Sequence, residues 1–320
     1  MKLLFLSSDP VALPCLRALA ANTVEGLELA GVVTNPDRRS GRGKRILRNP
    51  VAAEADRLGA PVLQPERPQA ETLESFVGFD LALVFAYGRI LSRKTLSLRP
   101  DRFLNLHASP LPLLRGPSPI ETAVAEGYPA TEVCLMRMVP RMDAGPVAAR
   151  LPVPVPAGET GPGLRATIAG ESVRLLGSIP AALRGDRRWE PQDESRASWC
   201  RMIAKTDALV DFTLSAERIE ARARAFAKWP GAAIQAAGET IRIADLSVVP
   251  SEGRPGEILE AGERLVVAAG AGALAIRTLQ RPTRKPVPWP EFRKARPLRE
   301  GALLPFTLSR PLVGFARNRD

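Results

Sequence analysis

The stretch Phe103–Gly116 reads FLNLHASPLPLLRG and holds the only histidine among the 320 residues. Apolar and polar residues alternate at its start, so a strand there would place Asn105 and His107 on the same face. Imidazole exchanges protons near neutrality, and the proline-rich loop that follows is stiff. Taken alone, the histidine is as well explained by an ordinary core or surface position. With the loop beside it, the stretch predicts a strand end that carries an acid–base site.

Strand and helix patterns alternate on both sides of this stretch. Apolar runs predict strands, and capping residues with amphipathic spacing predict helices. The strands are expected at 3–6, 27–34, 81–85, 103–107 and 133–139, and the helices at 50–59, 118–126 and 164–183, the last with a bend at Pro180. This order predicts a parallel, doubly wound α/β sheet, in which ligands bind beyond the carboxyl ends of strands. Asn105, His107 and Asp143 are all expected at such ends.

A change in pattern divides the chain. We expect one domain over residues 1–184, a polar linker over 185–205 and a second domain over 206–320. The second domain begins with a helix at 215–227. Short alternating runs divided by glycine-rich turns follow at 240–248, 257–259, 264–268 and 273–278. Closely spaced short strands of this kind predict a small β-barrel.

Composition narrows the class of protein. A net charge of +11 favours a polyanionic partner such as nucleic acid. Cys15, Cys134 and Cys200 form no Cys-x-x-Cys pair, so we expect reduced, buried cysteines in a cytoplasmic protein and no zinc site. The apolar run at 1–6 is too short for a secretory signal, and no window offers the roughly 18 to 20 apolar residues that a membrane helix needs.

The segment 35–48 carries six basic residues against one acidic residue. It contains Gly-Arg-Gly-Lys without the spacing of a nucleotide-binding P-loop, so we expect no nucleotide hydrolysis. We interpret it as an unstructured cationic loop that orders on a nucleic-acid backbone, with a solvated surface loop as the alternative. A second basic cluster, at 281–299, fits a nucleic-acid contact and a solubilising surface equally well.

These segments together resemble the methionyl-tRNA formyltransferase family over nearly the whole chain. The resemblance rests on 105–112 with Arg115 and Gly116, on 141–145 and on 86–91. It implies a Rossmann-like formyltransferase domain followed by an OB-like β-barrel domain that holds tRNA. The chain departs from the family at Ser7-Ser8, where Gly-Thr is usual, and at Pro117-Ser118, where small alanines are common.

The resemblance implies transfer of a formyl group from 10-formyltetrahydrofolate to the α-amino group of initiator methionyl-tRNA, without a metal. Asn105 and His107 would stabilise the oxygen of a tetrahedral centre as it becomes negative. His107 would also protonate the departing folate nitrogen, and Asp143 or a bound water would take the proton of the amine. The implied product serves translation initiation.

Two further sets of residues follow from the resemblance. The expected folate-binding residues are Ala86, Tyr87, Gly88, Ile90, Leu91, Ser109, Pro110, Leu111 and Pro112. The expected tRNA-binding residues are Arg38, Arg39, Arg42, Lys44, Arg45, Arg48 and Lys205. The protein is expected to be a monomer with no membrane partner.

Two alternatives remain open from the sequence. A formyltransferase for a sugar nucleotide or another small amine would share Asn105, His107 and Asp143, but it would have little use for a strongly basic loop. A catalytically inactive RNA-binding protein with the same fold would bind tRNA with strong salt dependence and never transfer the formyl group.

Overall fold

A seven-stranded sheet with the order β5-β2-β1-β6-β7-β8-β9 forms the N-terminal half of the molecule. The computed structural model describes residues 1–40, 45–236 and 238–315. The strands are β1 (Lys2–Leu6), β2 (Glu28–Val33), β5 (Val62–Leu63), β6 (Leu81–Phe85), β7 (Phe103–His107), β8 (Ala130–Arg137) and β9 (Val147–Pro154). In β1, β6 and β7 the apolar side chains are buried, because helices cover both faces of the sheet.

The helices of this half are α1 (Leu13–Ala20), α2 (Pro50–Arg57), α3 (Ala70–Glu74), α4 (Arg93–Leu96), α5 (Pro119–Ala125), α6 (Gly161–Leu176) and α7 (Ser178–Arg184). Asn49 caps α2, since its side chain accepts from Val51 N. The predicted bend of the long helix at Pro180 is wrong. The break falls at Gly177, and Pro180 lies in the first turn of α7, where a missing N–H group costs no helix hydrogen bond.

The sheet is parallel from β5 to β7, as predicted, but β8 and β9 run antiparallel to their neighbours. Leu104 pairs with Arg137, so β8 ends at the edge of the sheet where β7 begins. Asp143 was expected at the carboxyl end of a parallel strand, on the same edge as Asn105 and His107. That expectation was wrong, because the carboxyl end of the antiparallel strand β8 lies at the opposite edge. The loop 138–146, which follows β8, instead returns Asp143 to the edge where β7 ends, beside His107.

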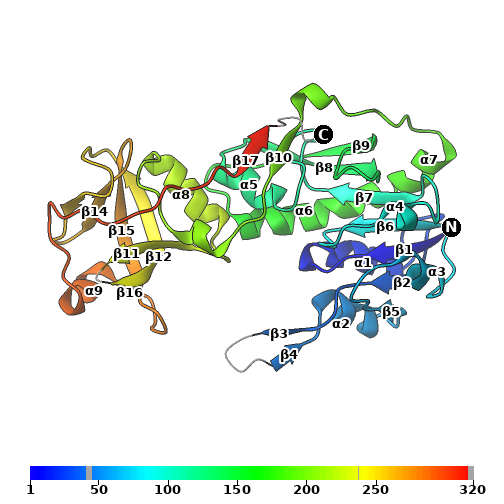
Figure 1. Ribbon diagram of the computed structural model, residues 1–320, viewed down its shortest axis with the longest axis horizontal. Coiled ribbons are helices and arrows are strands. Elements are labelled where there is room, and N and C mark those ends of the chain that lie inside the picture. The colour runs from blue at the N-terminus through cyan, green and yellow to red at the C-terminus, as the bar shows by residue number, and fades with distance from the viewer. Residues whose placement is uncertain (41–44, 237, 316–320) are drawn as a thin grey trace.

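Two described parts of the basic segment 35–48 pair as strands, which corrects the prediction of an unstructured loop for these residues, and we refer to this strand pair as the hairpin. Strands β3 (Arg38–Ser40) and β4 (Arg45–Leu47) pair in antiparallel fashion and project from the sheet (Figure 1). The base of the hairpin is fixed because Arg48 Nη2 contacts Asp56 Oδ2 at 2.7 Å and Asn49 N donates to Asp37 Oδ1 at 3.0 Å.

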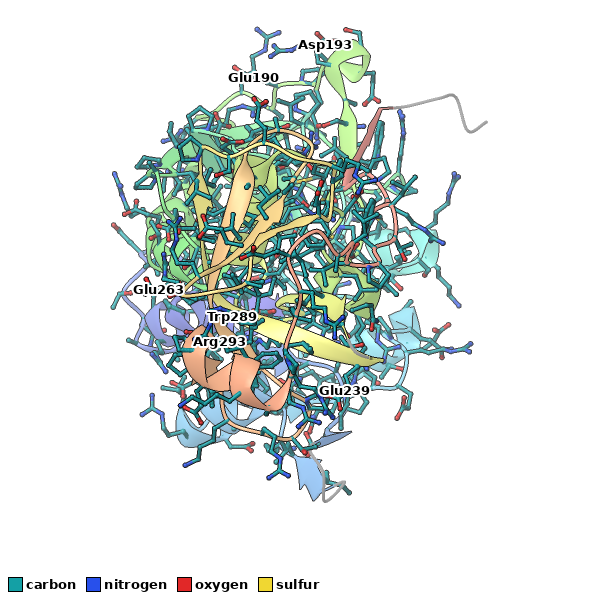
Figure 2. The ribbon with its side chains drawn as sticks, turned by 90° about the vertical axis from the view of Figure 1, so that its left-hand side faces the viewer. Glu190, Asp193, Glu239, Glu263, Trp289 and Arg293 are labelled. Carbon is teal, nitrogen blue, oxygen red and sulfur yellow. The ribbon has the colours of Figure 1, made fainter. Side chains whose placement is uncertain are left out.

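An antiparallel β domain forms the other end of the molecule, as predicted. Its six-stranded sheet has the order β11-β12-β15-β14-β13, with β16 beside β15. The strands are β11 (Ala232–Ala236), β12 (Glu239–Val249), β13 (Ile258–Glu260), β14 (Leu265–Ala268), β15 (Ala273–Gln280) and β16 (Val287–Pro288). Helix α9 (Trp289–Ala295) covers one end, where Trp289 and Arg293 both donate to the carbonyl oxygen of Gly262 (Figure 2).

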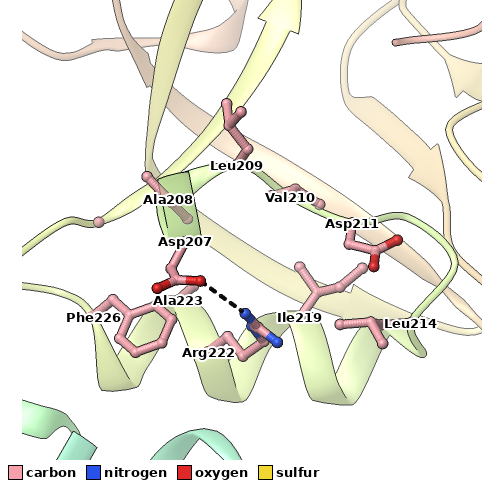
Figure 3. Close-up of a pocket in the computed structure, with 12 residues that line it drawn as sticks. Asp207, Ala208, Leu209, Val210, Asp211, Leu214, Ile219, Arg222, Ala223 and Phe226 are labelled. Atoms are coloured by element: carbon pink, nitrogen blue, oxygen red, sulfur yellow. Dashed lines mark ion pairs between the residues drawn. The ribbon is translucent and has the colours of Figure 1, made fainter. Parts of the chain in front are cut away.

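Helix α8 (Ala216–Ala225) joins the two halves. Its predicted start at Ser215 is confirmed, because the hydroxyl of Ser215 accepts from Arg218 N. The side chain of Arg218 pairs with Glu126 after α5, and Phe226 lies in the core of the N-terminal half. Arg222 on α8 faces Asp207 at 3.9 Å across a hollow of about 20 Å³ (Figure 3). That hollow has room for little more than one water molecule.

The segment 185–205, predicted as a linker, lies along the N-terminal half. It contains β10 (Ser198–Cys200), which pairs with β17 (Val313–Phe315) after the chain returns from the far end (Figure 1). The described residues also form three 3₁₀ turns, η1 (Pro10–Ala12), η2 (Glu194–Arg196) and η3 (Lys205–Ala208). All three cysteines are free and buried. In the described part of the chain, no helix combines the length and the apolar character needed to cross a membrane.

Candidate active site

The carboxyl ends of β1, β2, β6 and β7 meet at one edge of the sheet, and hydrogen bonds join the loops that follow β1, β2 and β6. Ser8 N donates to Ala86 O at 3.3 Å, and Asn35 Nδ2 donates to Tyr87 O at 3.0 Å. The hydroxyl of Ser8 also accepts from Asn35 N at 2.8 Å. Ser8, one of the departures from the family pattern, thus stabilises the rim of this edge.

His107 lies at this edge between a carbonyl and a carboxylate. Its Nε2 lies 3.1 Å from Leu114 O, and its Nδ1 lies 3.7 Å from Asp143 Oδ2. A carbonyl only accepts, so Nε2 carries a hydrogen and Nδ1 is the nitrogen that exchanges a proton. Asn105 precedes His107 by two strand positions and shares its face. The structure brings the three predicted catalytic residues together.

A backbone hydrogen bond fixes the carboxylate of Asp143. Its Oδ2 accepts from Gly116 N at 2.8 Å, and the side chain remains 17% exposed. Ala86, Leu114 and Asp143 adopt positive φ angles of 50°, 54° and 50°. Non-glycine residues in this left-handed region carry strain of order 1–3 kcal/mol each, and such strain gathers at functional sites.

Gly116 is a position where only glycine fits. It has φ of 113°, and an added Cβ would clash with the carbonyl oxygen of Cys200. We expect Gly116→Ala to lower the free energy of unfolding by about 2–4 kcal/mol, because strain and a backbone clash add. Thermal unfolding measures this. The matched control is Gly185→Ala, which has φ of 92° with open space around it and should lose only about 1–2 kcal/mol. Equal losses in the two variants would rule out the clash.

The predicted folate-binding residues lie beyond β6 and β7. Tyr87 and Leu91 are buried, whereas Ile90 is 77% exposed. Burial raises the pKa of the Tyr87 phenol to about 12, so this side chain stays neutral. Among the described residues, the backbone groups of Gly88 and Ile90 have no hydrogen-bond partner. The loop therefore offers free backbone donors and acceptors beside an apolar wall.

The loop after β7 is rigid. Ser109 Oγ donates to Leu113 O at 2.7 Å, and Leu111 O accepts from Arg150 Nη1 at 2.7 Å. Leu111 is buried, and Pro110 and Pro112 flank it. The four predicted residues at 109–112 thus border the same edge as His107.

The predicted tRNA-binding residues fall into three groups. Arg42 and Lys44 lie outside the described residues, and Arg38, Arg39 and Arg45 lie on β3 and β4. Arg48 contacts Asp56, Asp37 and Gln64, so its guanidinium is already engaged in holding the hairpin. Lys205 lies apart from the hairpin, beside a groove of about 440 Å³ that Arg242 and Arg281 also line.

Two residues near the site, Gln192 and Cys200, had no functional assignment from the sequence. Arg115 is 0% exposed, and its guanidinium contacts Gln192 and Glu194, both from the segment 185–205. Hydrogen bonds from Arg115 lower the pKa of Glu194. Cys200 lies behind this pair, and burial raises the pKa of its thiol to about 12, so it remains protonated. The polar pattern around Gln192 gave no sign of these contacts.

No three His, Cys, Asp or Glu side chains lie close enough to hold a metal ion within residues 1–40, 45–236 and 238–315.

Comparison with known proteins gives matches along most of the chain. The family model described as "Formyl transferase" matches residues 1–178, and the one described as "Formyl transferase, C-terminal domain" matches residues 202–297. The chain is 36% identical over 311 residues to a methionyl-tRNA formyltransferase of Roseiflexus castenholzii, covering 95% of this chain and 99% of that protein. The corresponding protein of Cereibacter sphaeroides is 35% identical over 308 residues, with the same coverage.

Solved structures share the fold at lower identity. An N-formyltransferase from Helicobacter canadensis, in complex with folinic acid and dTDP-3-aminofucose, gives a TM-score of 0.65 at 15% identity over 88% of this chain and 100% of that one. HypX from Aquifex aeolicus, in complex with tetrahydrofolic acid, gives a TM-score of 0.59 at 18% identity over 96% of this chain and 51% of that one.

Proposed function

Because the chain belongs to the formyl transferase family, we propose that it transfers a formyl group from 10-formyltetrahydrofolate to the α-amino group of methionyl-tRNA, and that the accepted tRNA is the initiator. One observation carries the proposal. Asn105, His107 and Asp143 converge at one sheet edge in a chain that matches methionyl-tRNA formyltransferases over 95% of its length.

Formyl transfer places negative charge on the formyl oxygen as the amine attacks the formyl carbon. The folate supplies the activated formyl group when bound. Asn105 carries an amide donor on the same face as His107, so it is suited to hold that oxygen. A donor aimed at such an oxygen contributes about 3–4 kcal/mol to transition-state stabilisation in other acyl-transfer sites.

Proton transfer falls to His107 and Asp143. The hydrogen bond from Nε2 to Leu114 O leaves Nδ1 to exchange the proton, and Nδ1 faces Asp143 at 3.7 Å. His107 is therefore placed to protonate the departing nitrogen, and Asp143 to accept the proton of the amine directly or through water.

The donor fits the two loops beyond β6 and β7. A pterin ring needs backbone donors and acceptors along its edge and apolar contact on its faces. Gly88 and Ile90 offer free backbone groups among the described residues, and Leu91 and Leu111 supply buried apolar surface. We assign Ala86, Tyr87, Gly88, Ile90, Leu91 and the loop at 109–112 to folate binding.

We assign tRNA binding to the hairpin and to Lys205. The hairpin projects from the N-terminal half of the molecule, which also carries the active site (Figure 1), and its basic residues match a phosphate backbone. Because Arg48 is engaged with Asp56 and Asp37, we leave it out of the phosphate contacts. We further propose a cytoplasmic monomer with domains at 1–184 and 206–320.

The direct test incubates purified protein with 10-formyltetrahydrofolate and methionylated initiator tRNA. Methionylated elongator tRNA and an amino-sugar nucleotide serve as parallel acceptors. We expect rapid formylation of the initiator alone. Faster transfer to the amino sugar would favour the small-amine alternative, and salt-dependent tRNA binding without transfer to any acceptor would favour the inactive RNA-binding alternative.

The hairpin gives a separate prediction. We expect Arg42→Ala to raise the KM for tRNA about 3- to 10-fold, since one phosphate contact is worth about 1 kcal/mol. The KM for folate should stay unchanged, and the salt dependence of tRNA binding should weaken. The control is Arg57→Ala on α2, because Arg57 is exposed and pairs with Glu54. Equal changes in both KM values would count against the assignment.

A further inference from the structure

One side chain of the connecting segment 185–205 contacts the turn that carries Asp143. Gln192 is buried to 9% exposure, and its Nε2 donates to Asp143 O and to Gly145 O, both at 2.7 Å. Glu190, two residues earlier, exchanges both backbone hydrogen bonds with Val147 at the start of β9. Glu190 and Asp193 mark the path of this segment along the rim of the molecule (Figure 2).

Arg115 fixes the orientation of the Gln192 amide. Its Nε and Nη2 donate to Gln192 Oε1 at 3.1 and 2.8 Å. A guanidinium only donates, so the amide oxygen must face Arg115 and the amide nitrogen must face the turn at Asp143. All four hydrogen-bonding positions of the amide are then used. Arg115 thus fixes the amide oxygen of Gln192, and the amide nitrogen of Gln192 fixes the turn at Asp143.

The turn needs such a lock because Asp143 has a φ of 50°. Residues other than glycine are less stable in the left-handed region, and although Asp adopts it more readily than most, hydrogen bonds from neighbouring groups stabilise it there. Gln192 holds the carbonyl of Asp143, and Gly116 N holds its carboxylate at 2.8 Å. The adjacent residues Arg115 and Gly116 therefore control the backbone and the side chain of Asp143 respectively, the first of them through Gln192.

We propose that Gln192 is a positioning residue of the reaction. It holds the backbone of Asp143 so that the carboxylate faces His107, and the buried Arg115 fixes the orientation of the Gln192 amide. This inference rests on the proposed role of Asp143. Gln192 touches neither substrate in this scheme and acts only through the turn. The segment 185–205 is accordingly a part of the active-site support as well as a connection between domains.

Gln192→Glu is the sharpest test. The carboxylate keeps the length of the side chain and the contact with Arg115, but it turns an acceptor toward two carbonyl oxygens and so repels the turn. We expect kcat to fall about 10- to 100-fold, with the KM values for tRNA and for 10-formyltetrahydrofolate within about 2-fold of the wild type. The control is Gln69→Glu, an exposed residue before α3 whose side chain caps nothing.

A double-variant cycle separates positioning from a general structural effect. If Gln192 acts through Asp143, Gln192→Glu combined with Asp143→Ala is no slower than Asp143→Ala alone. Multiplied losses, or an unchanged kcat in Gln192→Glu, would overturn the inference. If Asp143→Ala alone retains wild-type turnover, the proposed role of Asp143 fails instead. Should Gln192→Glu not fold, Gln192→Met, which keeps the length without an N–H donor, is measured by the same criteria.

Discussion

His107→Ala is expected to lower kcat about 10²- to 10⁴-fold, the contribution that a positioned acid–base group typically makes. The variant loses the only histidine of the chain and with it the proton-exchanging Nδ1 that faces Asp143. Single-turnover formylation of methionyl-tRNA measures the effect without interference from product release. Folding should survive, because the side chain contributes one hydrogen bond, to Leu114 O, worth about 1 kcal/mol.

A rescue experiment distinguishes loss of chemistry from loss of structure. His107→Ala leaves a space at the edge of the sheet that added imidazole can enter. We expect imidazole to restore part of the rate in this variant and to leave the wild type unaffected. Wild-type kinetics in His107→Ala would refute the assigned role.

Asp143→Asn is expected to lower kcat about 10²-fold or more, since it removes the negative charge beside His107 and keeps the shape of the side chain. The amide oxygen can still accept from Gly116 N, so the loop geometry should persist. Thermal unfolding within a few degrees of the wild type would confirm that point.

The matched control for the charge is Asp186→Asn, which removes a carboxylate from an exposed pair with Arg184. We expect no change in kcat there. A loss in Asp143→Asn no larger than that of the control would show that the carboxylate takes no part in proton transfer.

Local pattern predicted the centre of the fold well. The alternation in FLNLH and the apolar run at 81–85 gave β7 and β6 with the bounds that the structure has. Both strands consist mainly of apolar residues that are buried in the sheet, so the pattern within each short segment is enough to predict a strand. Strand β9 was not predicted, since Pro152 and Pro154 disfavour a strand. Both prolines are tolerated because β9 is an edge strand, in which the N–H groups on the outer side need no partner strand.

The site was predictable only in part, for a related reason. Asn105 and His107 share one strand, so their common face follows from local geometry. Gln192 reaches Asp143 across 49 residues of sequence, and nothing in a polar stretch indicates which side chain turns inward. The charged residues and glycines of the basic segment 35–48 likewise favour a loop, although β3 pairs with β4 within it.

Strand β17 follows the β domain in the sequence, and its pairing with β10 has a consequence for the connection between the two halves. Strand β10 binds the backbone of Arg115 through Ser198 O at 2.9 Å and Cys200 N at 2.7 Å. The strand that supports the Arg115 backbone is thus itself paired with a strand that follows the C-terminal β domain in the sequence. The chain therefore crosses between the two halves twice, once on the way to the β domain and once on the return to β17, so the β domain is tied at both of its ends to the half that carries the catalytic residues.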